Sequence, residues 1–486
     1  MIETIYYRGF VNFCNYSCSY CPFSKKKKEP SRIRKDMEVL DRLYGELKQE
    51  KLRKNLMITP YGEVMCLEEY QKRFISFSSL EQIAYIGVQT NLSFEVNSFL
   101  KEVVKQGGRP DKMVFWATWH PEFVSPEEFA AKVNLLSESC KISVGAVANG
   151  NNVEQMKTMR RLLNKKIYFW LNATDKLRVS FKENQIEKFC EIDPMFSYEF
   201  SRNREEFKIC ASHRNTYMDG YIVSKTCFFK KKKNIDITCS DHKQCNCYLG
   251  YSNFIDTKLR TFFGDTIAFR LPQKRKFECV FLDFDGILTD GEGKMRSDVF
   301  PILEELSAKS RLYLATARSF GSVRRKLGTK MAYFRGGVFS DGADIREDSL
   351  RLRERFLLDR DLVSDIFESC AGFSGIHIDK AEGEGILRLG LPSSVAEIMG
   401  DGRIQRRRYA TKCYLQHREA SKKNGILKIV ETYGLNKRDV LFVSDNMQDD
   451  EVFRELPYTV SPLCRKELRE KSSYSLNLEH LIWILE

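Results

Sequence analysis

The chain of 486 residues has no run of ten or more apolar residues, whereas a membrane-spanning helix needs about 20. We therefore expect no membrane span. Nothing in the sequence resembles a secretory signal or an internal repeat. Histidine is scarce, with six in the chain and none before His120, so mixed Cys/His zinc sites have few ligands. The 15 cysteines then indicate thiols in a reducing, cytoplasmic setting more than disulfides.

Basic residues outnumber acidic ones and give a net charge of +13. Two lysine runs, 25–28 and 230–233, contribute to the excess, and each follows a cysteine-rich segment. They indicate either attraction of a phosphorylated substrate or polyanion, or solvated loops. The basic stretch from Arg403 to Lys412 has the same two interpretations.

The first cysteine group lies near the start, where Cys14, Cys18 and Cys21 have C-x3-C-x2-C spacing. Three thiolates at this spacing can hold three irons of a four-iron cluster and leave the fourth open for S-adenosylmethionine (SAM). A structural zinc site would need a fourth ligand, and the nearest spare thiol is Cys66. Aromatic residues crowd the loop, as expected for a cluster shielded from water. The sequence predicts an open-site [4Fe-4S] cluster, with zinc as the alternative.

Over the first 200 residues, six apolar runs alternate with amphipathic helical patterns. Six such units predict an α/β fold, a parallel and partly closed (β/α)6 barrel of the TIM type, with its chemistry at the carboxyl ends of the strands. Polar residues follow those strands in the segments 61–63, 90–91 and 118–120.

With the cysteine triad, this pattern resembles the radical SAM superfamily over most of residues 1–200. The resemblance implies that Tyr61-Gly62-Glu63 corresponds to the Gly-Gly-Glu element that receives the SAM amino group, with a tyrosine in place of the first glycine. Asn91 is a further candidate for cofactor binding. His120 is as compatible with a helix cap or a backbone contact as with substrate. A reductant such as flavodoxin or ferredoxin is implied as a partner.

A second cysteine group lies in residues 201–270. Its members, close together in polar sequence, are Cys210, Cys227, Cys239, Cys245 and Cys247. The run from Cys210 to Gly220 is similar to the SPASM or Twitch extension of radical SAM enzymes, which implies an auxiliary [4Fe-4S] cluster held by four of the five thiols. The alternative is a zinc knuckle completed by His213 or His242.

The third block, residues 274–486, contains four short motifs that suit phosphoryl transfer. Asp283 ends a strand-like run, and Asp285 lies two residues on; a nucleophile and an acid have this spacing. Thr316 ends the next run and is placed to bind the transferred phosphoryl group. Lys423, with Lys422 as the alternative, is expected to stabilise negative charge.

Asp445 and Asp449 follow a third strand-like run and are the expected acidic pair for Mg2+, with Asp283 and Asp285 as further ligands. The four motifs together resemble the haloacid dehalogenase (HAD) phosphohydrolases, and an acid at Asp285 implies a phosphatase. The stretch GGVFSDGADI resembles the Cof and sucrose-phosphatase branch, which implies a Rossmann-like domain with an α/β cap inserted at about residues 345–412.

The sequence therefore predicts a bifunctional enzyme. A deoxyadenosyl radical would oxidise, dehydrate or epimerise a phosphorylated sugar or nucleoside-like metabolite, and the HAD domain would hydrolyse a phosphate monoester. Two alternatives remain open. One is a peptide-modifying maturase, and the other is a nucleic-acid modification or repair enzyme that removes terminal phosphates.

Overall fold

The structure is a computed structural model of the whole chain, and it describes residues 2–21, 26–174, 181–196, 214–225, 227–228, 258–370, 374–383, 385–396, 402–409, 412–463 and 465–486. The chain forms two compact units, Met1–Gln273 and Lys274–Glu486. Within these described ranges, no helix is long and apolar enough to cross a membrane.

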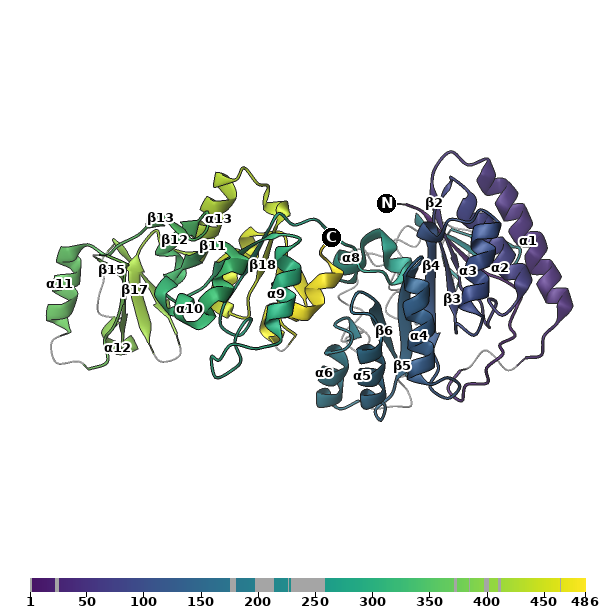
Figure 1. Cartoon of the computed structure of the whole chain (residues 1–486), viewed down its shortest axis with the longest axis horizontal. Coiled ribbons are helices and arrows are strands. Elements are labelled where there is room, and N and C mark those ends of the chain that lie inside the picture. The colour runs from purple at the N-terminus through teal and green to yellow at the C-terminus, as the bar shows by residue number, and fades with distance from the viewer. Residues whose placement is uncertain are drawn as a thin grey trace. The chain divides into compact units, whose positions relative to one another are not determined.

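The first unit contains one eight-stranded sheet with the order β6-β5-β4-β3-β2-β1-β7-β8. Figure 1 labels its strands β2 to β6. Its strands are β1 (Thr4–Arg8), β2 (Lys54–Ile58), β3 (Ile83–Thr90), β4 (Met113–Trp119), β5 (Lys141–Ala148), β6 (Tyr168–Ala173), β7 (Thr216–Asp219) and β8 (Ile222–Ser224). The intervening helices are α1 (Pro30–Lys48), α2 (Glu68–Ser79), α3 (Val96–Lys105), α4 (Pro126–Ser137), α5 (Val153–Leu162) and α6 (Glu183–Cys190). All neighbouring strands pair in parallel except β7 and β8.

Strands β1 to β6 lie side by side in chain order, which is the order of a (β/α) barrel with right-handed crossovers. The six predicted strand and helix units are therefore present. In the described part of the chain, no strand pairing joins β6 to β8, so closure into a barrel stays a prediction.

The two faces of this sheet differ in composition. One face is apolar and packs on the helices: Phe74 of α2 and Phe99 of α3 both contact the ring of Phe115 on β4. The opposite face, called here the inner face, carries large aromatic and polar side chains such as Trp116 and Trp170. This alternation follows from the two-residue period of a strand.

A short segment covers the amino-terminal half of the inner face. It consists of α8 (Lys258–Phe263) and the 3-10 helix η5 (Gly264–Phe269). The Phe269 carbonyl accepts a hydrogen bond of 2.8 Å from Ser143 Oγ. The buried guanidinium of Arg270 lies 4.4 Å from the ring centre of Trp170 and 5.1 Å from that of Trp116. The aromatic half of the inner face is thereby closed, and the carboxyl ends of the strands remain partly exposed.

The second unit is built on a sheet with the order β13-β12-β11-β10-β9-β18-β19-β20. Its strands are β9 (Cys279–Leu282), β10 (Arg311–Ala315), β11 (Phe334–Phe339), β12 (Asp344–Glu347), β13 (Arg351–Arg355), β18 (Val440–Val443), β19 (Thr459–Ser461) and β20 (Tyr474–Ser475). The helices are α9 (Val299–Ser307), α10 (Phe320–Leu327), α13 (Lys422–Thr432), α14 (Asp450–Glu455) and α15 (Lys466–Arg469). Six parallel strands, β11 to β20 in this order, form a Rossmann-like centre, and β12 and β13 extend it antiparallel.

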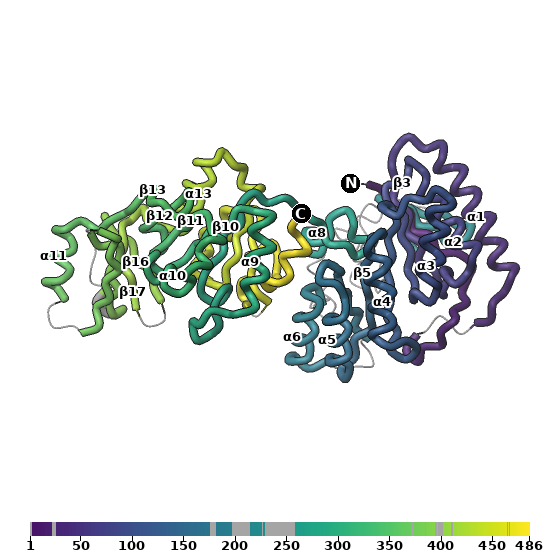
Figure 2. The backbone as a smooth tube through the Cα atoms, viewed as in Figure 1, coloured from purple at the N-terminus to yellow at the C-terminus, as the bar shows by residue number. Residues whose placement is uncertain are grey.

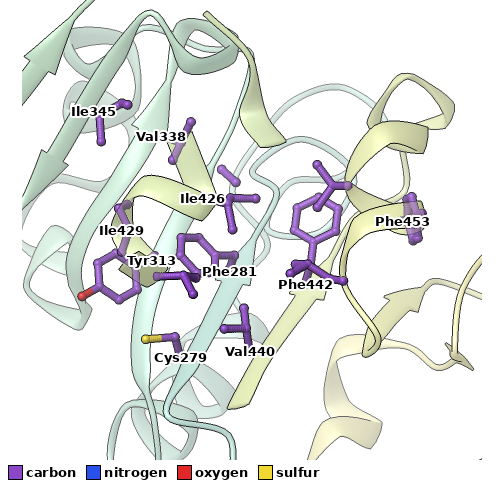
Figure 3. Packing of buried hydrophobic residues seen from close by; sticks show 14 of the residues in the cluster. Cys279, Phe281, Tyr313, Val338, Ile345, Ile426, Ile429, Val440, Phe442 and Phe453 are labelled. Atoms are coloured by element: carbon purple, nitrogen blue, oxygen red, sulfur yellow. The ribbon is translucent and has the colours of Figure 1, made fainter. Parts of the chain in front are cut away.

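The core of this unit lies between the sheet and α13 and α14. Phe281 of β9 and Tyr313 of β10 stack with ring centres 5.0 Å apart, and Ile426 and Ile429 of α13 belong to the same buried cluster (Figure 3). Because β9 is central and buried, the residues that follow it are held at a fixed place at the carboxyl edge of the sheet.

A smaller antiparallel sheet, called here the cap sheet, has the order β14-β15-β17-β16. Its strands are β14 (His377–Lys380), β15 (Ile386–Leu391), β16 (Ile404–Arg408) and β17 (Cys413–His417), with α11 (Arg360–Ser369) and α12 (Ser393–Ala396). The chain leaves the main sheet after β13 and returns to it at α13 (Figure 2).

The predicted cap limits of 345–412 need correction at both ends. β12 and β13 lie inside those limits but pair with the main sheet, because β12 is buried and hydrogen bonded to β11. β17 lies entirely after residue 412 and pairs within the cap sheet. The insertion into the main domain therefore runs from the end of β13 to the start of α13.

Candidate active sites

Asp283 follows β9 at the carboxyl edge of the main sheet and is only 4% exposed. Its Oδ1 accepts a hydrogen bond of 2.7 Å from the amide of Phe284. Its Oδ2 accepts from Lys422 Nζ and from Ser444 Oγ, each at 3.1 Å. Three donors thus fix the carboxylate in one orientation at the end of the central strand, which suits a nucleophile.

The structure corrects the choice between two adjacent lysines. Lys422, and not Lys423, contacts the carboxylates, with Nζ 2.9 Å from Asp449 Oδ2 as well as 3.1 Å from Asp283. α13 begins at Lys422, so this side chain points back toward the strand ends, and the next residue is turned by about 100° to a half-exposed position. Lys423 instead lies near Glu455.

The charges at this centre do not balance. Burial raises the pKa of Asp283 and of Asp449, and Lys422 opposes the shift. Burial also works to lower the pKa of Lys422, but the two carboxylates outweigh it and raise that pKa. Two buried carboxylates therefore share one ammonium group, and a further cation would offset the remaining negative charge.

Asp285 and Asp445 are also at this edge but are held by arginines. Arg318 makes a two-point ion pair with Asp285 at 2.7 and 2.8 Å, and Arg465 lies 2.7 Å from Asp445 Oδ2. The Asp445 carboxylate packs directly on Gly286, where φ is +72° and a Cβ would overlap it. Position 286 therefore requires glycine, because any side chain there would overlap the Asp445 carboxylate and would have an unfavourable positive φ.

The donor set fits Mg2+ in chemistry, because it consists of carboxylate oxygens and because Asp283 and Asp449 share a single ammonium group. Across the part of the chain that is described, no three His, Cys, Asp or Glu side chains already form a metal cluster. Mg2+ at Asp283, Asp285, Asp445 and Asp449 stays a prediction. Thr316 is fully buried beside this centre, and its Oγ1 accepts from the amide of Arg318 at 3.1 Å.

Three residues at this site were not found from the sequence. Ser444 joins the two buried aspartates through hydrogen bonds of 3.1 and 2.6 Å. Arg318 holds Asp285, and its place two residues after Thr316 was the available signal. Asp341, at a φ of +51°, accepts from Arg388 Nη1 of the cap sheet at 2.8 Å.

The contact at Asp341 brings the polar face of the cap sheet to the catalytic edge. Tyr409, which follows β16, donates to the same Asp341 oxygen at 2.5 Å. The buried Arg388 also pairs with Asp379 within the cap. Asp341 contributes to the raised pKa of Lys422 and so lies close to the carboxylate centre.

Replacing Lys422 with Met is expected to lower kcat/KM for phosphate release by at least about a hundredfold, since the ammonium that offsets two buried carboxylates is lost. Lys423→Met is the matched control and should stay within about threefold of the parent. Steady-state release of phosphate from p-nitrophenyl phosphate with Mg2+ measures both variants. A larger loss in Lys423→Met than in Lys422→Met would contradict the assignment.

The cysteine triad lies in the loop after β1. Cys18 is buried, and Cys14 and Cys21 are partly exposed. The loop after β2 packs tightly on it, because a Cβ on Gly62 would overlap the Phe13 carbonyl, and the amide of Glu63 donates to that carbonyl at 2.8 Å. The YGE segment is therefore placed directly beside the cysteines.

His120, which follows β4, contacts the middle cysteine. Its Nδ1 lies 3.2 Å from Cys18 Sγ and 2.7 Å from the Tyr20 hydroxyl. Glu122 accepts two hydrogen bonds from Ser19, of 2.9 and 2.5 Å. The loop after β4 thus fixes the cysteine loop, and the contact of His120 with a thiol was not predicted.

The Cys18 and Cys66 thiols lie in buried surroundings that disfavour the thiolate form. Burial raises the pKa of Cys18 to about 11, and that of Cys66 to about 12. A metal that binds these sulfurs must therefore displace their protons. The three cysteines suit iron or zinc by donor type, and they remain predicted ligands.

Glu63 is buried, 2% exposed, and ties the loop to the end of β3. It accepts from the Met65 amide at 2.7 Å, from Thr90 Oγ1 at 2.9 Å and from the Asn91 amide at 2.5 Å. Burial raises the pKa of Glu63 to about 7, although the three hydrogen bonds act to lower it. A carboxylate has about four acceptor positions, so one is left for an ammonium group. Its predicted SAM role, and that of Gly62 and Asn91, stays a prediction.

In the second cysteine group, Cys210, Cys239, Cys245 and Cys247 lie outside the described residues, as do His213 and His242. Cys227 is described and is partly buried. The auxiliary cluster therefore stays a prediction.

Replacing Gly62 with Ala is expected to push the loop after β2 away from the cysteine loop and to lower the iron bound after anaerobic reconstitution by half or more. Gly45→Ala on α1 is the matched control, because no atom lies within 4 Å of its Cβ position. That change should stabilise the helix by about 1 kcal/mol. Iron analysis and thermal unfolding of both variants test the steric argument, and parent-like iron in Gly62→Ala would contradict it.

No protein-family model matches this sequence, and no curated protein matches it significantly. Among solved structures, a HAD subclass IIB sugar phosphatase is 13% identical, with 42% of this chain and 94% of that chain covered and a TM-score of 0.37. A haloacid dehalogenase-like hydrolase from Bacteroides thetaiotaomicron is 14% identical, with 43% and 98% covered and a TM-score of 0.38. One from B. subtilis is 11% identical, with 42% and 99% covered and a TM-score of 0.37. With scores below 0.5, these similarities carry no functional conclusion.

Proposed function

We propose that residues 274–486 hydrolyse phosphate monoesters as a HAD-type phosphatase of the Cof and sucrose-phosphatase kind. The observation that carries the proposal is Asp283, a buried carboxylate at the end of the central strand, bound by Lys422 and Ser444 beside Asp449. This is a fixed nucleophile with a neighbouring cation.

In this mechanism an Asp283 oxygen attacks phosphorus and forms an aspartyl phosphate, and the bond from phosphorus to the alcohol oxygen breaks. The Asp285 carboxyl gives its proton to the leaving oxygen and then takes a proton from the water that attacks the phosphorus. In that second step the bond from phosphorus to the Asp283 oxygen breaks, so that inorganic phosphate leaves and the Asp283 carboxylate is restored. Lys422 offsets charge on the nucleophile and phosphoryl oxygens. Because Arg318 holds both Asp285 oxygens, that ion pair has to separate before Asp285 acts as an acid.

Mg2+, held by Asp283, Asp449 and Asp445 with Asp285 alongside, would supply positive charge to the phosphoryl oxygens. The cap would enclose the substrate, and Arg388 and Tyr409 already bring its polar face to Asp341. Water is thereby kept from the reacting group until the alcohol has left. The substrate class that suits such a cap is a small organic phosphate, a sugar or nucleoside-like phosphate.

The proposal is tested with the parent chain, p-nitrophenyl phosphate and a panel of sugar and nucleoside phosphates. We expect phosphate release that needs Mg2+ and stops with a chelator. Absence of release from every compound at saturating Mg2+ would contradict a phosphatase.

For residues 1–273 we propose radical SAM chemistry. The observation that supports it is the placement of the Gly62-Glu63 loop directly on the cysteine loop, at the carboxyl ends of six parallel strands in chain order. A [4Fe-4S] cluster on Cys14, Cys18 and Cys21, reduced by a small electron carrier, would cleave SAM and supply the radical. Glu63 would hold the SAM amino group, and an auxiliary cluster would be held by the second cysteine group.

One observation favours a second candidate for this unit. His120 lies against Cys18 and would be the fourth ligand of a closed Cys3His zinc site. Metal analysis of protein purified without oxygen separates the two. Iron with equimolar sulfide supports the cluster, whereas one zinc per chain that resists anaerobic exchange with iron supports a structural site.

A further inference from the structure

The inner face of the first unit ends in a group of partly exposed polar side chains. Arg8, Gln89, Thr118, Asn172 and Asp219 occupy the carboxyl ends of β1, β3, β4, β6 and β7, and strand register puts them on the same face as Trp116. Within the described residues, the side chains of Gln89 and Thr118 make no hydrogen bond to protein. Since the segment α8–η5 closes the other half of this face, the carboxyl end is where a ligand has access.

Arg8 is the cation of this group, and two aromatic rings fix its position. Its guanidinium carbon lies 3.9 Å from the ring centre of Phe228 and 4.6 Å from that of Tyr61. Nη1 donates to the Tyr61 hydroxyl at 3.0 Å. The two rings hold the guanidinium in place, and the hydrogen bond to Tyr61 uses only one of its N–H donors. A guanidinium group has five such donors in a planar fork, which suits two-point binding of an anion.

No carboxylate in the described part of the chain neutralises Arg8. Asp219 is its register neighbour on β7 but forms no ion pair with it, and the buried Arg8 Nε has no hydrogen-bond partner. An anion that binds here would pair with the unsatisfied donor and offset the positive charge of Arg8, so its binding would be favourable. Contact with Arg8 also gives a reason for a tyrosine at position 61, where the radical SAM resemblance implies glycine.

We propose that Arg8, held by Tyr61 and Phe228, binds an anionic group of the molecule on which the first unit acts, a phosphate monoester or a carboxylate. Gln89, Thr118 and Asn172 would bind the uncharged polar part of that molecule. The proposal rests on the proposed function only in that this molecule is the substrate of the radical step. The anion site itself needs neither cluster nor SAM.

The first test maps arginine modification by phenylglyoxal in the full-length chain by peptide mass spectrometry. The probes are inorganic phosphate and acetate, with chloride at equal ionic strength as the reference. We expect phosphate, acetate or both to slow modification of Arg8 by about fivefold or more. The probe that protects Arg8 more strongly shows whether the bound group is a phosphate or a carboxylate. The exposed Arg34 on α1 should be unaffected. Less than twofold protection of Arg8 by both probes would overturn the proposal.

A second measurement does not depend on Arg8 reacting with the reagent. Phosphate and acetate are titrated while thermal unfolding is followed in the parent and in Arg8→Gln, which share any anion site in the second unit. We expect a smaller rise in Tm in Arg8→Gln. Equal rises would overturn the site, and since no cluster is needed, a failed radical reaction would not affect either result.

Discussion

Replacing Asp283 with Asn is expected to lower phosphate release by at least about a thousandfold, because the amide is not a nucleophile toward phosphorus. The fold should tolerate the change. Asp283 and Asp449 share Lys422, so removal of one charge leaves a balanced pair in the buried site. Thermal unfolding should therefore show a Tm equal to or above that of the parent.

Asp290→Asn is the matched control for this variant. Asp290 lies in the same segment but is exposed, and its Oδ1 accepts from the amides of Glu292 and Lys294, each at 2.9 Å. An asparagine keeps that acceptor, so activity should stay within about twofold of the parent. Full phosphatase activity in Asp283→Asn would contradict the nucleophile assignment, and deoxyadenosine formation by the first unit should be unaffected in both variants.

Replacing Cys14, Cys18 and Cys21 together with Ala is expected to abolish 5'-deoxyadenosine formation. Bound iron should fall from about eight to about four per chain if the second cysteine group holds its own cluster. The loss follows because thiolates are the protein's only bonds to such a cluster, and the second unit should keep its phosphatase activity.

Cys66→Ala is the control, because Cys66 lies close to the triad and its thiol donates to the Glu63 carbonyl. We expect unchanged iron in this variant. Unchanged iron in the triple variant would refute the first cluster. Loss of iron in Cys66→Ala would instead show that Cys66 is a fourth ligand, so that no iron is left open for SAM.

Much of the fold follows from sequence pattern. Short apolar runs alternate with amphipathic helices, and this pattern predicted β1 to β6 and the strands that directly precede Asp283 and Thr316. The cap limits were wrong because the start was placed from the family resemblance of the stretch GGVFSDGADI. Pairing of β12 with β11, and of β13 with β12, shows that these strands belong to the main sheet. Local sequence does not record such pairing.

The candidate sites were predictable only where chemistry depends on short spacing. Asp283 and Asp285 are two residues apart at a strand end, and sequence shows this directly. The choice of Lys422 over Lys423 depends on the rotation at which α13 begins, and the contact between His120 and Cys18 joins residues 102 positions apart. Both depend on how separate elements pack.

The most direct test of the account traps the aspartyl phosphate. In Asp285→Asn, hydrolysis of this intermediate should be slow, so borohydride added during turnover of a phosphate monoester with Mg2+ should reduce it to homoserine. Peptide mass spectrometry locates the change. We predict homoserine at position 283 and at no other aspartate. Homoserine at a different aspartate, such as Asp449, would contradict the central role of Asp283.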